Sequence, residues 1–490
     1  MATPISLRIL INEEKNKVLF AQAGKDFTDV LLSFLTFPLA TIARLVSTES
    51  NMQKVSFGSI SKLYQSVANL EEHQFWTPAC KQMLLQPKNS MEHYYQNLKI
   101  NIDVAQKPCY YVCENWYCSR ELSGGLLTTF SNLKCRCGKF MSQKICLSDT
   151  EKVQNFDGFF ADAVTFCISD DLSLKPDSFQ NFICQPMNLL GFEDFNAIKF
   201  ITVDVTHKEI LDLLKLSLTS ESPLTDMFLL KKQSIENTQL NSVLDFAIGI
   251  VEENDGKKIE VKVVMRKSNS KILFALGDAD FADFILSFLT FPIGGVEHML
   301  KGNSCGSSID NLYKSILELD SDTYLKTSDL KEKLVKSKLA HQFKLRNQLL
   351  PFDEMPHVDY FCVTRHNRKK TGFHAYLTAF EELSICTKEL SVPLRYLEPQ
   401  ISIGEVFARS GGKGFMKSPS LYMVTDDLVV TPSSSVSVIS FLSNLGIPSS
   451  DLEERMITIG KFEGLSILKA SLISSSALSN GLGPFLKVKD

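Results

Sequence analysis

The sequence predicts an α+β fold, built by tandem duplication of a unit of about 240 residues. The strongest evidence is internal similarity, since residues 18–38 and 272–292 share 13 identities in 21 positions. Shorter matches keep an offset near 250 residues along most of the chain. In both copies, alternating strand patterns precede helical patterns. This order favours mainly antiparallel sheets with helices packed on them.

Each copy begins with a predicted β-hairpin followed by a helix. Leu7, Ile9 and Ile11 alternate with residues of the opposite face, as expected of a strand. Turn residues and a second apolar run, ending at Phe20, complete the hairpin. Apolar residues between 27 and 34 then recur at helical spacing, and Pro38 predicts the end of that helix. Residues 261–292 repeat the whole pattern.

The second part of each copy predicts another hairpin-plus-helix module. In the first copy the predicted elements are strands at 164–169, 172–175 and 198–205, and helices at 179–190 and 207–218. Their counterparts are strands at 421–425, 428–431 and 456–459, and helices at 436–445 and 462–472. We therefore predict two repeat units, 1–251 and 259–490, with a Cys-rich insert at about 109–146 in the first.

Composition is that of an ordinary globular protein. The chain has 490 residues, of which 44% are hydrophobic and 22% charged, and its formal net charge is −4. These values exclude a disordered chain, a collagen and a coiled-coil rod. They give no general reason to bind nucleic acid or an anionic membrane. The local excess of basic residues from Lys326 to Lys370 is read as a solvated face, with weak phosphate contact or a nuclear address as the alternative.

No targeting signal or membrane span is expected. The N-terminus lacks the charged start and apolar core of a secretory signal. The uncharged apolar runs at 30–43 and 284–296 are shorter than the ~20 residues that a membrane span needs. We expect a cytoplasmic protein, with the nucleus as the alternative. In that reducing compartment the 12 cysteines should not be assumed to form disulfides.

One cysteine cluster is a candidate metal site. Cys113, Cys118, Cys135 and Cys137 lie within 25 residues, in the pattern C-x4-C-x16-C-x-C. Four thiolates suit a tetrahedral structural zinc that holds together a loop without its own core. The C-x-C step is one residue shorter than a usual zinc knuckle. Four unliganded thiols therefore remain the alternative. The second copy keeps Cys362, with Cys386 as a further candidate, but no set of four, so one zinc would belong to the first unit alone.

The remaining candidates favour structural roles. The pairs Asp26/Asp29 and Asp280/Asp283 sit where helices are predicted to start, so we interpret them as helix caps. The Asp170-Asp171 and Asp426-Asp427 pairs are predicted turns. The Gly-rich stretch 410–415 lacks a Walker pattern, and the eight histidines form no HxH, HExxH or Ser-His-Asp signature. No catalytic or cofactor-binding residue is predicted.

The repeated motifs resemble a plant family catalogued as domain of unknown function 674. They are the segment Lys25–Pro38, the insert Cys113–Gly138 with its CxCG ending, and the hairpin Thr425–Pro432. The resemblance covers essentially the full length and implies no reaction, ligand or partner. Duplicated modules without a catalytic signature favour a non-enzymatic interaction or scaffold protein with a protein partner. The alternative is a small-molecule-binding protein or enzyme with a site between the two units.

Overall fold

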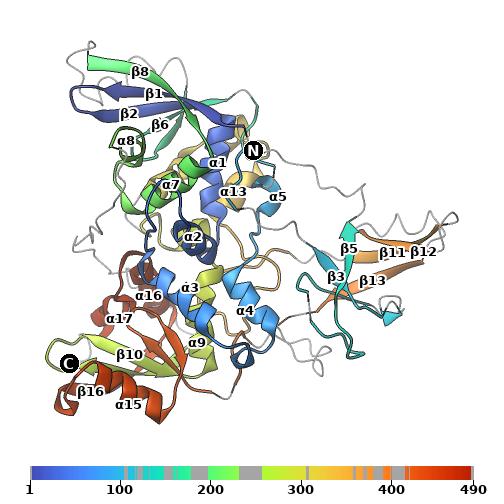
Figure 1. The fold of residues 1–490 in the computed structure, drawn as a ribbon, viewed down its shortest axis with the longest axis vertical. Coiled ribbons are helices and arrows are strands. Elements are labelled where there is room, and N and C mark those ends of the chain that lie inside the picture. The colour runs from blue at the N-terminus through green and yellow to red at the C-terminus, as the bar shows by residue number, and fades with distance from the viewer. Residues whose placement is uncertain are drawn as a thin grey trace.

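The computed structural model contains three sheets and a layer of helices between them (Figure 1). Two of the sheets have five strands each, and the third has six. The residues that the structure describes are 3–95, 97–103, 109–115, 117–118, 125–131, 133–147, 158–162, 164–177, 197–230, 256–304, 308–356, 360–367, 372–378, 390–397, 399, 414–418 and 420–486.

The first five-stranded sheet uses only residues of the first half. Its strand order is β7-β6-β2-β1-β8, and every neighbouring pair is antiparallel. The strands are β1 (Ile5–Asn12), β2 (Lys17–Gly24), β6 (Thr165–Ser169), β7 (Leu174–Pro176) and β8 (Ile198–Val205). Alternation along β1 buries Leu7 and Ile9 completely while Ser6 and Arg8 are exposed. That period of two gives the sheet one face for the core.

The second five-stranded sheet repeats this order in the second half. Its strands run β15-β14-β10-β9-β16, again antiparallel throughout. They are β9 (Ile259–Arg266), β10 (Ile272–Gly277), β14 (Tyr422–Thr425), β15 (Val430–Pro432) and β16 (Leu452–Ile459). Even local backbone detail matches, because Leu172 and Leu428 have φ values of 64° and 65° after the Asp-Asp turns.

Helices from both halves meet in the middle of the molecule. In the first half these are α1 (Lys25–Thr36) and α2 (Leu39–Val46), and in the second α9 (Ala279–Ser287), η6 (Phe288–Thr290) and α10 (Ile293–Met299). Pro38 and Pro292 form an antiparallel bridge between the halves. The N–H of Leu39 donates to the Phe291 carbonyl at 3.0 Å, and reciprocally the N–H of Ile293 donates to that of Phe37 at 3.0 Å. One hydrophobic core therefore runs through both halves.

In each half, some helices pack against the other half. From the first half these are α3 (Gly58–Asn69), η1 (Glu72–Gln74) and α4 (Pro78–Leu85). From the second half they are α11 (Ser308–Glu318), α12 (Ser321–Tyr324) and α13 (Asp329–Val335). Ser59 Oγ donates to the Ser474 carbonyl at 2.6 Å, while Ser315 Oγ accepts from the Leu174 N–H at 2.9 Å. The two halves are interlocked as a result.

The six-stranded sheet draws three strands from each half. Its order is β3-β5-β12-β11-β13-β4. The strands are β3 (Tyr110–Val112), β4 (Gly125–Leu127), β5 (Gln143–Leu147), β11 (Tyr360–Asn367), β12 (Gly372–Thr378) and β13 (Leu390–Tyr396). Tyr111 and Thr128 exchange backbone hydrogen bonds of 2.7 and 3.0 Å, which joins the outer strands and closes the sheet into a small barrel. It projects to the right in Figure 1.

Further elements complete the described chain. They are α5 (Glu92–Tyr95), α7 (His207–Thr219), α8 (Pro223–Thr225), the π-helical turn η5 (Asp226–Leu230), α15 (Ser435–Asn444), η8 (Ser449–Asp451), α16 (Lys461–Ile473) and α17 (Ala477–Leu486). Within the described ranges, no helix combines the length and apolar character needed to cross a bilayer.

The α+β prediction is confirmed, and so are most predicted elements. The strand at 198–205 is β8 residue for residue, and the helices predicted at 207–218, 436–445 and 462–472 are α7, α15 and α16 within one residue at each end. Both Asp-Asp pairs do form turns. The helix predicted at 179–190 lies outside the described residues, and so do residues 252–255 of the polar joint that the sequence predicts at 252–258.

Candidate metal centre

The four cysteines of the candidate site lie at one end of the barrel. Cys113 directly follows β3, and Cys118 comes five residues later. Cys135 and Cys137 lie in the connection between β4 and β5. Because β3 is hydrogen-bonded both to β5 and, through Tyr111, to Thr128, the sheet brings the two chain segments side by side. Short-range strand pairing therefore explains why cysteines 24 residues apart meet.

A tight turn presents Cys135 and Cys137 on the same side. The N–H of Gly138 donates to the Cys135 carbonyl at 2.9 Å, and the N–H of Cys135 donates to the Lys139 carbonyl at 2.8 Å. Gly138 has φ of +82°, which is costly for a residue with a Cβ. The CxCG sequence is thus explained by the backbone: the glycine allows the turn that leaves both sulfurs facing Cys113.

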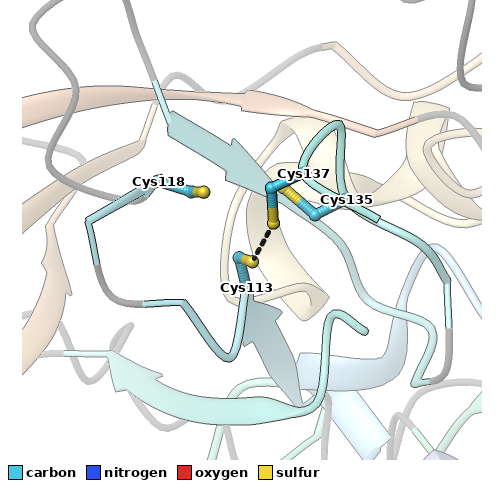
Figure 2. Close-up of side chains that lie close together, drawn as sticks. All are labelled: Cys113, Cys118, Cys135 and Cys137. Carbon is cyan, nitrogen blue, oxygen red and sulfur yellow. Dashed lines mark hydrogen bonds between the residues drawn. The ribbon is translucent and has the colours of Figure 1, made fainter. Parts of the chain in front are cut away.

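All four sulfurs converge on one point. They lie within 4.8 Å of one another, and Cys113 Sγ is 3.5 Å from Cys137 Sγ (Figure 2). A tetrahedral zinc with Zn–S bonds of about 2.3 Å needs sulfur–sulfur distances of about 3.8 Å. The arrangement is thus close to that of a tetrathiolate site and needs only small side-chain adjustments to become one.

Backbone N–H groups point at two of the sulfurs. The Asn115 N–H donates to Cys113 Sγ at 3.3 Å. A hydrogen bond from the Lys139 backbone lowers the pKa of Cys137 to about 7. Burial raises the pKa of Cys118 to about 11 and that of Cys113 further. A metal ion must displace the protons of the buried thiols, whereas Cys137 provides a thiolate near neutral pH.

The four cysteines differ in how deeply they are buried. Cys113 and Cys135 are each only 2% exposed, Cys118 is half-buried, and Cys137 is exposed. Cys362 does not join them; it is buried inside the barrel beside Val112 and Leu377. Cys386 lies outside the described residues. The structure thus brings together the four cysteines that the sequence singled out, all from the first half.

The capping interpretation of the Asp pairs is wrong for Asp29 and Asp283. The residue capping α1 is Gly24, without a side-chain bond, and the cap of α9 is Asp278, which accepts from the Phe281 N–H. Asp26 instead forms an exposed ion pair with Lys99 at 3.2 Å. The D-x-x-D spacing is compatible with a helix cap, but the second aspartate of each pair lies one turn inside its helix, on the buried side.

Asp29 and Asp283 anchor distant backbone segments. Asp29 Oδ1 accepts from the N–H groups of Phe159 and Phe160 at 2.7 and 3.0 Å. Asp283 Oδ1 does the same for Phe415 and Met416, at 2.9 Å each. Burial raises the pKa of Asp29 to about 7 and that of Asp283 well above its usual range. The anchored segments pair with the other half through the bridges Phe160–Leu325 and Phe75–Met416.

A second group of polar side chains, which no sequence pattern predicted, lies at the barrel core. The Tyr110 and Tyr360 hydroxyls are 3.2 Å apart, and the Tyr396 ring is 6.2 Å from that of Tyr360. Burial raises the pKa of Tyr110, with further contributions from both tyrosines and Glu92. Tyr111 and Tyr360 match in sequence, but the structure places Tyr110 against Tyr360.

Lys88 lies near the same group. Its ammonium is 4.9 Å from the centre of the Phe130 ring, and burial lowers its pKa to about 8, while Glu92 acts in the opposite direction. Both Lys88 and Tyr110 are therefore close enough to Glu92 to feel its charge. The basic run at 365–370, by contrast, lies partly in β11 and partly outside the described residues.

Comparison with known proteins identifies a family and nothing more specific. The family model described as "Protein of unknown function (DUF674)" matches residues 2–462, so the chain belongs to that family. No curated protein and no solved structure matches the chain.

Proposed function

We propose that this member of the DUF674 family is a non-catalytic interaction protein whose barrel is stabilised by one structural zinc ion. The convergence of four sulfurs within 4.8 Å carries the metal part of the proposal. Zinc prefers four thiolates at a structural site, and three of these four are at least half-buried, as a site closed to substrate requires. Cys113, Cys118, Cys135 and Cys137 would hold the ion and fix the end of β3 against the β4–β5 connection.

Elemental analysis of the purified full chain tests the metal site. We expect about one zinc per chain, falling below about 0.2 in Cys135→Ser, together with a lower melting temperature. Cys80→Ser is the matched control, because Cys80 is also fully buried but lies outside the cluster. A wild-type chain without zinc, or a Cys135→Ser chain that keeps it, would contradict the proposal.

The exposed side of α15 supports the interaction part of the proposal. No residue of this helix, SVSVISFLSN, carries a charge. Val438, Phe441 and Leu442 pack against the second sheet, whereas Val436 and Ile439 are 78% and 66% exposed. Leu421, at 59% exposure, adds to the exposed apolar residues of this lobe. Exposed apolar side chains gathered on one element are typical of a surface that another protein covers.

Quantitative co-purification tests this surface. The double change Val436→Glu and Ile439→Glu should remove a specific partner by at least tenfold without lowering the melting temperature, since neither side chain is buried. Leu317→Glu, on the exposed side of α11, is the control and should leave the partner bound. If the same proteins co-purify with all three chains, α15 is not the interaction surface.

The alternative of a small-molecule site between the halves is favoured by the tyrosines at the barrel core. Tyr110 belongs to the first half and Tyr360 and Tyr396 to the second, and polar groups converging at a junction are typical of ligand sites. Changing Tyr360 to Phe should then abolish a thermal shift produced by a ligand, while Tyr117→Phe, which is 80% exposed, should not. A hollow of about 430 Å³, lined by Lys271, Arg455 and Asn480, lies within the second half instead.

A further inference from the structure

The four cysteines differ in their access to solvent, and the most exposed one, Cys137, faces one of the two buried ones, Cys113. Cys137 is exposed, whereas Cys113 is 2% exposed. Their sulfurs are the pair at 3.5 Å, joined by the dashed line in Figure 2. A reagent in solution therefore reaches the cluster at Cys137 first, and the Cys113 sulfur lies 3.5 Å behind it.

These two sulfurs must come closer to form a disulfide. A disulfide requires a sulfur–sulfur distance of about 2.05 Å, so the pair must close by roughly 1.5 Å. Cys137 lies on a four-residue turn at the surface, and nothing lies within 4 Å of where a Cβ on the next residue, Gly138, would be. Because Cys137 is exposed, its side of the turn has open space in which to adjust.

We propose that Cys113 and Cys137 form a peroxide-sensitive pair, whose oxidation to a disulfide expels the zinc ion. This inference rests on the proposed zinc site. The Cys137 thiolate attacks one peroxide oxygen, the O–O bond breaks, and the sulfur becomes a sulfenic acid while water leaves after protonation. The Cys113 thiolate then attacks that sulfur and releases hydroxide, which takes up a second proton. Two thiolates, one hydrogen peroxide and two protons thus give one disulfide and two waters.

Loss of two ligands explains why the metal leaves. Cys118 and Cys135 alone cannot complete the four-coordinate site that a structural zinc requires. Cys113 directly follows β3, and Tyr111 of β3 makes the backbone hydrogen bonds to Thr128 that close the barrel. Release of the ion should therefore weaken these hydrogen bonds. The cluster would then link the oxidation state of the surroundings to the barrel that both halves build.

Zinc release measured with a chromogenic chelator tests this proposal on the purified, zinc-loaded full chain. We expect hydrogen peroxide to release one zinc for every two thiols lost, and peptide mass spectrometry to find a Cys113–Cys137 disulfide. A thiol reductant with added zinc should reverse both changes. Exchange of the Tyr111 and Thr128 amide hydrogens should speed up at least tenfold after oxidation.

Two variants make the outcome decisive. Cys137→His keeps a zinc ligand but cannot form the disulfide, so it should release zinc at least tenfold more slowly. Cys167→Ser, which alters a thiol outside the cluster, should behave as wild type. A chain that contains zinc but retains it in peroxide, or that forms a different disulfide, would overturn this inference alone. A chain purified without zinc would instead reject the metal site itself.

Discussion

Two buried carboxylates hold the middle of this molecule together. Asp29 and Asp283 occupy equivalent positions in α1 and α9, and each accepts two backbone N–H groups from a segment more than 120 residues away in sequence. A carboxylate in such a place is stabilised by its donors, but burial opposes its charge more strongly. These residues therefore couple stability to pH.

Asp29→Asn should flatten the dependence of stability on pH. The folded chain holds the Asp29 proton up to about pH 7, whereas an unfolded aspartate loses it near pH 3.9. The contribution of Asp29 to stability is therefore complete below about pH 4 and is lost as the pH rises from about 4 to about 7. The uncharged Asn keeps an oxygen for both donors and removes this loss, which is on the order of 4 kcal/mol at most.

Urea unfolding of the Asp29→Asn and wild-type chains at pH 5 and pH 8 measures the difference. The exposed Asp26→Asn is the matched control and should leave the slope unchanged. If Asp29→Asn loses as much stability between these pH values as wild type does, the carboxyl is charged in the folded chain throughout.

Gly158 lies against Asp29, and Gly414 lies against Asp283, so closely that neither position has room for a Cβ. A Cβ on Gly158 would meet Asp29 Oδ2 at 1.8 Å, and one on Gly414 would meet Asp283 Oδ2 at 1.8 Å. Both glycines also have positive φ values, of 116° and 150°. Gly158→Ala should therefore cost about 3 kcal/mol in unfolding free energy. Gly24→Ala, with φ of −83° and open space around it, should cost less than about 1 kcal/mol; equal losses would show that the close approach is absent.

Among secondary-structure elements, those with a strong local period could be predicted from sequence. β8 and α7 were predictable because alternation and helical spacing run unbroken through them. The barrel could not be predicted. Its strands β3 and β4 have three residues each, and β4 and β5 pair with β13 and β12 of the other half. No local pattern records such long-range pairing.

The buried side of α1, and its counterpart in α9 and η6 of the second half, should dominate stability. Phe34 and Phe288 are both fully buried in the shared core. Phe34→Ala should cost about 3–5 kcal/mol, as measured by urea unfolding, because it leaves a cavity where both halves pack. Phe200→Ala, at a side chain that is 54% exposed, is the control and should cost under about 1 kcal/mol. Similar melting temperatures for Phe34→Ala and wild type would refute the core assignment.

In the whole molecule, the two halves match and interlock. The five-stranded sheets share one strand order, and Asp29 and Asp283 repeat the same hydrogen bonds. We propose that the chain arose by duplication of one unit, as the sequence matches predict, followed by exchange of helices between the copies. The interlocking itself could not be predicted, because a repeat in sequence does not say which copy a helix packs against.

The cysteine cluster was only partly predictable for a related reason. Cysteine density pointed to the four residues whose sulfurs converge, but the C-x-C spacing did not fit a usual knuckle. The sequence does not show the turn at Gly138, which places Cys135 and Cys137 beside the end of β3. Nor does it show the backbone pairing of Tyr111 with Thr128, which holds β3 in place. The tyrosine group at the barrel core was missed because its members come from strands of both halves.

X-ray absorption at the zinc edge tests the central claim most directly. The full-length chain should show four sulfur neighbours at about 2.3 Å and no nitrogen or oxygen neighbour in the first coordination sphere. The matched Cys118→His chain should show three sulfurs and one nitrogen. A wild-type spectrum with nitrogen or oxygen ligands, or one indifferent to that substitution, would place the zinc away from Cys113, Cys118, Cys135 and Cys137 and contradict the account.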